Sequence, residues 1–265
     1  MDPLNFILLI AGGVCIGLLA GLFGISEGLL LVPFLLAVEL HAGVSSLLAT
    51  HVAVGTTLLV VALNAVRTTS MSFRNGSLIR RAALVAGVAG MVGAFCCAAL
   101  AGGFDGKTLR VLAGLATAVG AVRLFTQPRK PKGEQRIQDL RLAMIGVLGG
   151  GVSSLTGAGA NLLTIPMLYS GERFPLTKAA GTSSAVVLMA ALAGAGGYVM
   201  GGAGNSLLPE GFAGFLHPLP ALLLAAGVLP GAIAGDRLSV RMKGRLARKL
   251  FAFLLLVIAV RMFLA

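Results

Sequence analysis

Long apolar stretches separated by short polar loops run along the whole chain of 265 residues. Six of these stretches are uninterrupted, and each is close to the roughly 20 residues with which a helix crosses a bilayer. They cover residues 44–66, 82–101, 107–125, 177–200, 218–235 and 247–264. The pattern predicts an all-α polytopic membrane protein.

Two further apolar stretches, 4–38 and 142–169, are interrupted by small polar breaks that contain glycine. Neither has enough residues for two crossings of about 20 residues each. We therefore expect each to form a broken, re-entrant or V-shaped helical element with its tip near the middle of the membrane.

Composition agrees with a chain that has lipid as its solvent. Hydrophobic residues make up 57% of the positions and charged residues only 11%, which is too apolar for a soluble domain of this length. The 38 glycines indicate close helix contacts and broken helices. The net charge is +12, and the basic residues lie in short loops without interleaved aromatic residues. We therefore expect the protein to be embedded in a lipid bilayer and not to bind nucleic acid. The sequence does not decide whether the protein forms a homo-oligomer.

Loop charge predicts the orientation. The stretches 67–81, 126–141 and 237–249 are rich in Lys and Arg, whereas 201–217 contains neither. Positive-inside logic places the first three in the cytoplasm of an inner (plasma) membrane protein and the fourth outside. Both termini are then predicted outside, and the full spans of the two halves run in opposite directions.

Two aligned motifs support a duplication. Residues 17–33 align without gaps on residues 150–166, and residues 53–57 align on 179–183 in the same order. We predict two inverted-topology repeats, each with three full transmembrane helices plus one broken or re-entrant helical element. The first repeat covers 1–125, a basic cytoplasmic linker covers 126–141, and the second repeat covers 142–265, all in one integral membrane domain.

The motifs of residues 21–33, 51–57 and 73–76, with their counterparts at 150–166 and 179–184, resemble the sulfite exporter TauE/SafE family over nearly the whole chain. The resemblance implies a secondary transporter of a small sulfur-containing anion, of the sulfite, thiosulfate or organosulfonate class. The chain departs from the family's glycine run, because it has Ser26-Glu27-Gly28 in the first break and Gly159-Ala160-Asn161 in the second.

The two breaks are the predicted anion site. Helix ends at mid-membrane expose backbone N–H groups and the positive ends of helix dipoles, and inverted repeats bring such ends together. Hydroxyl and amide side chains beside them would add hydrogen bonds, although Ser and Thr also bond back to their own helix. For Thr56 and Thr182 the two interpretations are evenly balanced. The candidate substrate-binding residues are Gly24, Ser26, Gly28, Thr56, Thr57, Thr156, Gly157, Gly159, Asn161, Thr182 and Ser183.

Two titratable residues are candidates for coupling. Glu27 lies beside the first break, and an intramembrane carboxyl is a functional hypothesis by default, here as a protonated group or a proton-coupling site. The alternative is that it caps a helix or lies at the interface. His51 lies inside an apolar span, where it could titrate or form a hydrogen-bonded packing contact. We expect His217, Asn64, Arg67 and Asp236 at the membrane interfaces.

The leading hypothesis is an alternating-access carrier of a small anionic substrate. An anion channel, or a proton- or cation-coupled carrier of another small solute that uses Glu27, stays open. The sequence contains no intramembrane Ser/His/Asp set, no metal-spaced His cluster and no nucleotide-binding loop. We therefore expect no enzyme activity, no catalytic residues, no metal site and no cofactor.

Overall fold

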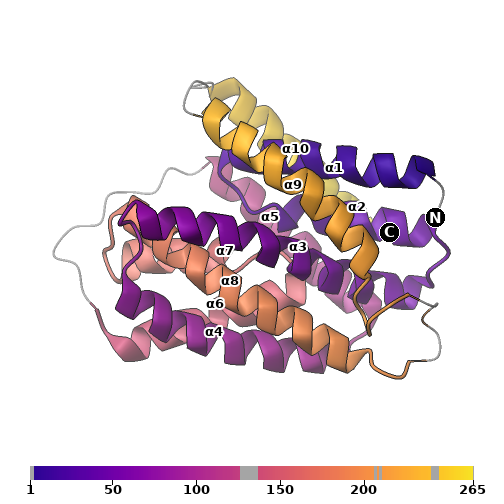
Figure 1. Cartoon of the computed structure of the whole chain (residues 1–265), viewed down its shortest axis with the longest axis horizontal. Helices are drawn as coiled ribbons and strands as arrows, with labels where there is room; N and C mark the ends of the chain where they lie inside the picture. Colours follow the sequence, from indigo (N-terminus) through magenta and orange to yellow (C-terminus); the bar gives the residue numbers. More distant parts are fainter. Residues whose placement is uncertain (1–2, 126–136, 206–207, 209–210, 240–244, 265) are drawn as a thin grey trace.

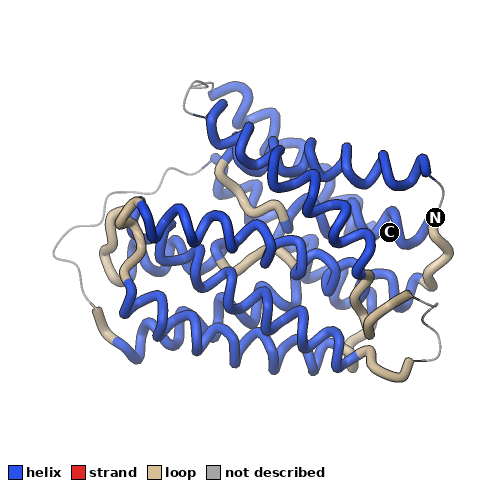
Figure 2. The backbone as a smooth tube through the Cα atoms, in the orientation of Figure 1, coloured by secondary structure: helices blue, strands red, loops and turns tan. Residues whose placement is uncertain are grey.

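The computed structural model describes residues 3–125, 137–205, 208, 211–239 and 245–264, and the regular secondary structure of this part of the chain is helical (Figure 2). The all-helical fold predicted from the sequence is confirmed. The elements in chain order are α1 (Pro3–Phe23), α2 (Gly28–His41), α3 (Ser46–Arg74), α4 (Arg80–Ala101), α5 (Gly106–Phe125), α6 (Asp139–Thr156), α7 (Asn161–Pro166), η1 (Met167–Gly171), α8 (Leu176–Gly201), α9 (Pro218–Ser239) and α10 (Arg245–Leu264).

Five described helices, α1, α3, α4, α8 and α9, are long and apolar enough to cross a membrane. Three of them, α4, α8 and α9, contain a predicted span, and α3 overlaps the span 44–66 but extends to Arg74. The helices α5 and α10 have 20 residues each, about 30 Å of helix, but α5 carries basic residues and the apolar part of α10 is the shorter Phe251–Phe263. Full crossings by α5 and α10 therefore stay predictions.

The helix α1 is longer than expected for one arm of a re-entrant element. It runs for 21 residues before its first interruption, which is about 31 Å and the thickness of a bilayer core. The break at residues 24–27 lies just past the middle of the stretch 4–38, so the two arms are unequal. The second arm, α2, has only 14 residues.

Both helix breaks fall where the sequence placed them. The first separates α1 from α2 at residues 24–27, and the second separates α6 from α7 at residues 157–160. Gly24 and Gly157 adopt left-handed backbone angles, with φ of 65° and 67°. This conformation is accessible to glycine without the steric penalty of a side chain, so the chain can leave each helix abruptly.

Glycine faces hold two helix pairs together. A methyl group added to Gly17 of α1 would overlap the Val228 carbonyl oxygen, and one added to Gly231 of α9 would overlap the Val14 carbonyl oxygen. Glycines at Gly146 and Gly150 bring α6 equally close to α4. Such contacts let two backbones approach without intervening side chains. We refer to the first set of helices as the α1–α9 pair.

The arrangement of helices gives the molecule two distinct ends. Figure 1 shows the beginning of α1 and the end of α10 at one end of the bundle, and the loop between α3 and α4 at the other. The predicted orientation makes the first end the outer one and the second the cytoplasmic one. Within the basic stretches on which that orientation depends, residues 126–136 and 240–244 lie outside the described residues.

Candidate functional site

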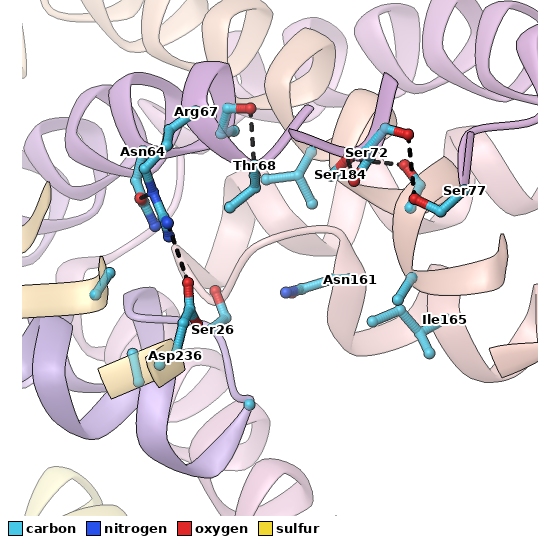
Figure 3. Close-up of a pocket in the computed structure, with 18 of the residues that line it drawn as sticks. Ser26, Asn64, Arg67, Thr68, Ser72, Ser77, Asn161, Ile165, Ser184 and Asp236 are labelled. Carbon is cyan, nitrogen blue, oxygen red and sulfur yellow. Dashed lines mark hydrogen bonds and ion pairs between the residues drawn. The ribbon is translucent and has the colours of Figure 1, made fainter. Parts of the chain in front are cut away.

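A cavity of about 660 Å³ lies between the α1–α9 pair and the helices α3 and α8. Pockets of this size are typical of small-molecule sites. Its wall contains both polar side chains of the first helix break and charged groups from three different helices (Figure 3). The lining residues used below are Gly21, Gly24, Ser26, Glu27, Asn64, Arg67, Ser72, Asn161, Lys178 and Asp236.

Four of these side chains form one hydrogen-bonded row, which we call the polar chain. The Nδ2 group of Asn64 donates to Oε1 of Glu27 at 2.9 Å. The Nε group of Arg67 donates to Oδ1 of Asn64 at 3.2 Å, and Nη1 of Arg67 donates to Oδ2 of Asp236 at 3.0 Å. The polar chain therefore links the first helix break to α9 through two neighbouring residues of α3.

Glu27 is the buried end of the polar chain, with 8% of its surface exposed. In the part of the chain that the structure describes, no cation lies within salt-bridge distance of it, whereas Arg67 forms an ion pair with Asp236. A carboxylate buried without a cation is costly in free energy. Among the described residues, the side-chain group bonded to Glu27 is the neutral amide of Asn64.

The two helix breaks meet beside the cavity. A methyl group added to Gly28 would overlap the carbonyl oxygen of Gly157, so the two backbones are in contact there. One added to Gly159 would lie 2.5 Å from Oγ of Ser26 and 3.1 Å from Oδ1 of Asn161. The side chains that depart from the family's glycine pattern therefore come together at this junction.

Asn161 has free hydrogen-bonding capacity. Its Oδ1 atom is buried and has no partner among the described residues. Figure 3 shows its amide directed into the cavity. Since an amide can both donate and accept, Asn161 is suited to a polar ligand.

The structure brings only some of the predicted site residues into the cavity wall. Gly24, Ser26, Glu27 and Asn161 line it. The other glycines of the breaks shape the junction but are not part of the wall. The hydroxyl of Thr156 donates to its own helix at Val152 and accepts from the Ala158 N–H, which closes the end of α6. The remaining predicted residues lie elsewhere, namely Gly28, Gly157, Gly159, Thr56, Thr57, Thr182, Ser183 and His51.

Thr56 and Thr182 have the same structural contact in the two halves. Oγ1 of Thr56 on α3 accepts from the backbone N–H of His217, just before α9, at 3.0 Å. Oγ1 of Thr182 on α8 accepts from the backbone N–H of Ile79, just before α4, at 3.1 Å. Each threonine therefore satisfies a backbone donor at the start of a helix, which favours the structural interpretation of both hydroxyls.

Thr57 and Ser183, the next aligned pair, are also buried outside the cavity wall. The hydroxyl of Ser183 pairs with that of Thr164 on α7. The hydroxyl of Thr57 has no partner among the described residues. The predicted second ring of hydroxyls therefore does not face the cavity.

His51 connects α3 to the turn between α4 and α5. Its Nε2 atom lies 3.1 Å from the carbonyl oxygens of both Ala101 and Phe104, and Nδ1 lies 3.2 Å from that of Leu47. The ring is buried and does not line the cavity. This geometry favours the packing role that the sequence left open.

Asn64, Arg67 and Asp236 are the site residues that sequence reasoning missed. Each was expected to anchor a membrane interface, and each instead lines the cavity. Asn64 and Arg67 are three residues apart on α3 and so share a helix face. The partnership of Arg67 with Asp236, however, joins residues 169 positions apart and has no local sequence signal.

A separate group of contacts, which we call the outer seal after the predicted orientation, joins α2 to the segment before α9 and α8 to α6. Oε1 of the fully buried Glu39 lies 2.9 Å from Nδ1 of His217, whose backbone also contacts Thr56. The hydroxyl of Tyr198 on α8 donates to the Ser154 carbonyl of α6 at 3.0 Å. His217 is thus a partly buried linking residue, and its expected position at the membrane interface stays a prediction.

The helical fold, the apolar spans and the polar cavity beside two broken helices define a multi-pass membrane transporter. The family model described as Sulfite exporter TauE/SafE matches residues 9–262, and the chain belongs to this family.

Three relatives are informative. A "Probable membrane transporter protein" of Haemophilus influenzae is 26% identical over 98% of this chain and 99% of its own length. A protein of the same name from Xylella fastidiosa strain 9a5c is 31% identical over 68% of each chain, and one from Methanocaldococcus jannaschii is 27% identical over 71% of this chain and 70% of its own. No solved structure matches the chain at a significant level.

Proposed function

We propose that this protein is a secondary transporter that moves a small sulfur-containing anion, of the sulfite, thiosulfate or organosulfonate class, across the inner membrane by alternating access. The observation that carries this proposal is the cavity where Ser26 and Asn161 meet beside the two helix breaks, with Arg67 and Lys178 in the same wall. Hydroxyl, amide and cationic groups are the ligands that oxyanions prefer.

The proposal includes two inverted repeats with both termini outside. The matching contacts of Thr56 and Thr182 support it, because aligned residues of the two halves bond to the starts of α9 and α4, which occupy equivalent places in the repeat order. The glycine contacts support it as well: α1 packs on α9 as α6 packs on α4. Unrelated halves would have no reason to repeat both contacts.

The cavity is proposed to open toward the cytoplasm. Asn75, Gly76 and Ser77 of the α3–α4 loop and Lys178 at the start of α8 line it, and these belong to the predicted cytoplasmic end. The outer seal lies at the opposite end. A cavity open on one side and closed on the other supports a carrier over an open channel.

Glu27 is proposed to couple transport to protons. A buried carboxyl held only by an amide can take up and release a proton as the cavity opens and closes, whereas a permanently ionised group would repel the anion. In the alternative, a cation carrier, Glu27 and Asp236 would be the ligands of the cation. Arg67 and Lys178 in the same wall oppose that alternative, because they would repel a cation.

The proposal is tested with purified protein in a thermal-shift screen against sulfite, thiosulfate, sulfate, sulfonates, carboxylates, chloride and metal cations. A ligand that binds only the folded state at about 100 times its Kd stabilises it by about 2.7 kcal/mol. We expect stabilisation by one or more sulfur oxyanions and none by chloride. A response to metal cations alone would refute the substrate class.

Flux into proteoliposomes tests the mechanism. A coupled carrier saturates and accumulates its anion against a gradient, whereas a channel only equilibrates it. Equilibration without accumulation under every imposed pH gradient would favour the channel.

A further inference from the structure

We propose that the Arg67 guanidinium binds the transported anion. In the empty transporter the Asp236 carboxylate occupies this guanidinium as an intramolecular competitor, and the anion displaces it. This inference rests on the proposed function and names the group that recognises the substrate. On this inference, the Arg67–Asp236 ion pair is present in the empty transporter and breaks when substrate binds, so it is not a permanent contact that stabilises the fold.

The donors of Arg67 are only partly used. Nε is bonded to Asn64, and Nη1 is shared between Asp236 and the sulfur atom of Met71, which is 3.7 Å away. No described residue accepts from Nη2. A guanidinium has five N–H donors arranged to bind two oxygens of one oxyanion at once, so the single-oxygen contact with Asp236 leaves binding capacity free.

The two partners are unequally fixed. The Arg67 side chain is 16% exposed and is oriented from the buried side by Asn64, whereas the Asp236 side chain is 47% exposed. No hydrogen bond other than that from Arg67 holds the Asp236 carboxylate among the described residues. It can therefore turn into water at small cost while the arginine stays in place, as a displaceable competitor requires.

Displacement of Asp236 also has a mechanical consequence. Asp236 lies on α9, whereas Glu27 is the residue directly before α2, and Asn64 and Arg67 lie on α3. The Asp236–Arg67 bond is thus a polar tie between the α1–α9 pair and α3, and the Glu27–Asn64 bond ties the start of α2 to α3. An anion on Arg67 releases the tie to the α1–α9 pair, which frees this pair to move when substrate is present.

The test is equilibrium binding of radiolabelled sulfite and thiosulfate to purified variants, with a melting temperature for each variant. Removing the competitor in Asp236→Asn is expected to tighten anion binding about fivefold, the scale of a partly exposed ion pair. Arg67→Gln is expected to weaken it by about tenfold or more. In the double variant, Asp236→Asn should give no gain, because the two effects act through one group.

Asp139→Asn is the matched control. Asp139 forms an exposed ion pair with Arg81 at 2.6 Å but does not line the cavity, so its loss changes the net charge equally without freeing a cavity arginine. We expect wild-type affinity from it. If Asp236→Asn is poorly folded, Asp236→Ser serves in its place, since the side chain is half exposed.

The outcomes separate the two proposals. If wild-type protein binds neither anion and no sulfonate stabilises it in the thermal-shift screen, the proposed function fails in its substrate class and this inference fails with it. If the wild type binds but Asp236→Asn binds equally or more weakly, with Asp139→Asn unchanged, only this inference is overturned and the ion pair is structural.

Discussion

Replacement of Glu27 by Gln is the most direct test of coupling. Gln has the same shape, and its Oε1 can still accept from Asn64 at the observed 2.9 Å. We therefore expect the free energy of unfolding to change by less than about 1 kcal/mol, whereas Glu27→Ala leaves the Asn64 amide without its partner and costs about 1–3 kcal/mol. Because its stability is expected to be near normal, Glu27→Gln removes the titratable group without disturbing the fold.

The assay is accumulation of sulfite in proteoliposomes under an imposed pH gradient. A gradient of one pH unit supplies about 1.4 kcal/mol per proton, so one-to-one coupling predicts about tenfold accumulation. We expect the wild type to approach this ratio and Glu27→Gln to equilibrate sulfite without accumulating it. Glu172→Gln is the control, because Glu172 is also fully buried but does not line the cavity. Wild-type accumulation by Glu27→Gln would refute proton coupling through this residue.

Three further predictions concern stability, each measured as thermal or denaturant unfolding in detergent. Gly28→Ala should unfold the protein or cost more than about 3 kcal/mol, because its methyl group would overlap the backbone of Gly157 in the other break. Thr182→Val should cost about 1–3 kcal/mol by leaving a backbone N–H unpaired, with unchanged sulfite affinity in the folded protein; a lost affinity would return Thr182 to the binding site. His217→Ala should cost about 1–3 kcal/mol by leaving the buried Oε1 atom of Glu39 without its hydrogen-bond partner, and equal stability would show that the Glu39–His217 contact contributes nothing.

The sequence was sufficient for the helical class and for the position of both breaks. Apolar length predicts helices, and a polar glycine-containing interruption inside such a length marks a break, so both signals are local. The sequence did not predict that the first arm, α1, is by itself long and apolar enough to cross a membrane.

The composition of the cavity wall could be predicted only in part. Ser26, Glu27 and Asn161 were found because polar residues inside an apolar stretch are conspicuous. Arg67 and Asp236 were assigned to the interface, because a charged residue at a helix end has the same local pattern whether it anchors the helix or faces a cavity. Only the packing of α9 beside α3 distinguishes the two.

The hydroxyl-rich motifs show a second limit of predicting a binding site from sequence. The alignment of Thr56 with Thr182 predicts similarity between the halves, and the structure gives both residues the same backbone contact. At this pair, repetition in sequence therefore accompanies a structural bond, which the sequence alone does not distinguish from a ligand contact.

The hydrogen bond of Tyr198 to Ser154 in the outer seal has a thermodynamic consequence for the transport cycle. When the aligned motifs are extended along their helices, Tyr198 corresponds to Ser72 and Ser154 to Gly21, and both of these line the open cavity. If the halves exchange conformations, the shorter side chain of Ser72 cannot reproduce the bond that the tyrosine hydroxyl makes to a backbone carbonyl. One buried hydrogen bond is worth about 1 kcal/mol, so this single difference would favour the inward-facing population about fivefold. Without substrate, the equilibrium between the two conformations of the carrier would thus depend on the positions at which the sequences of its two halves differ.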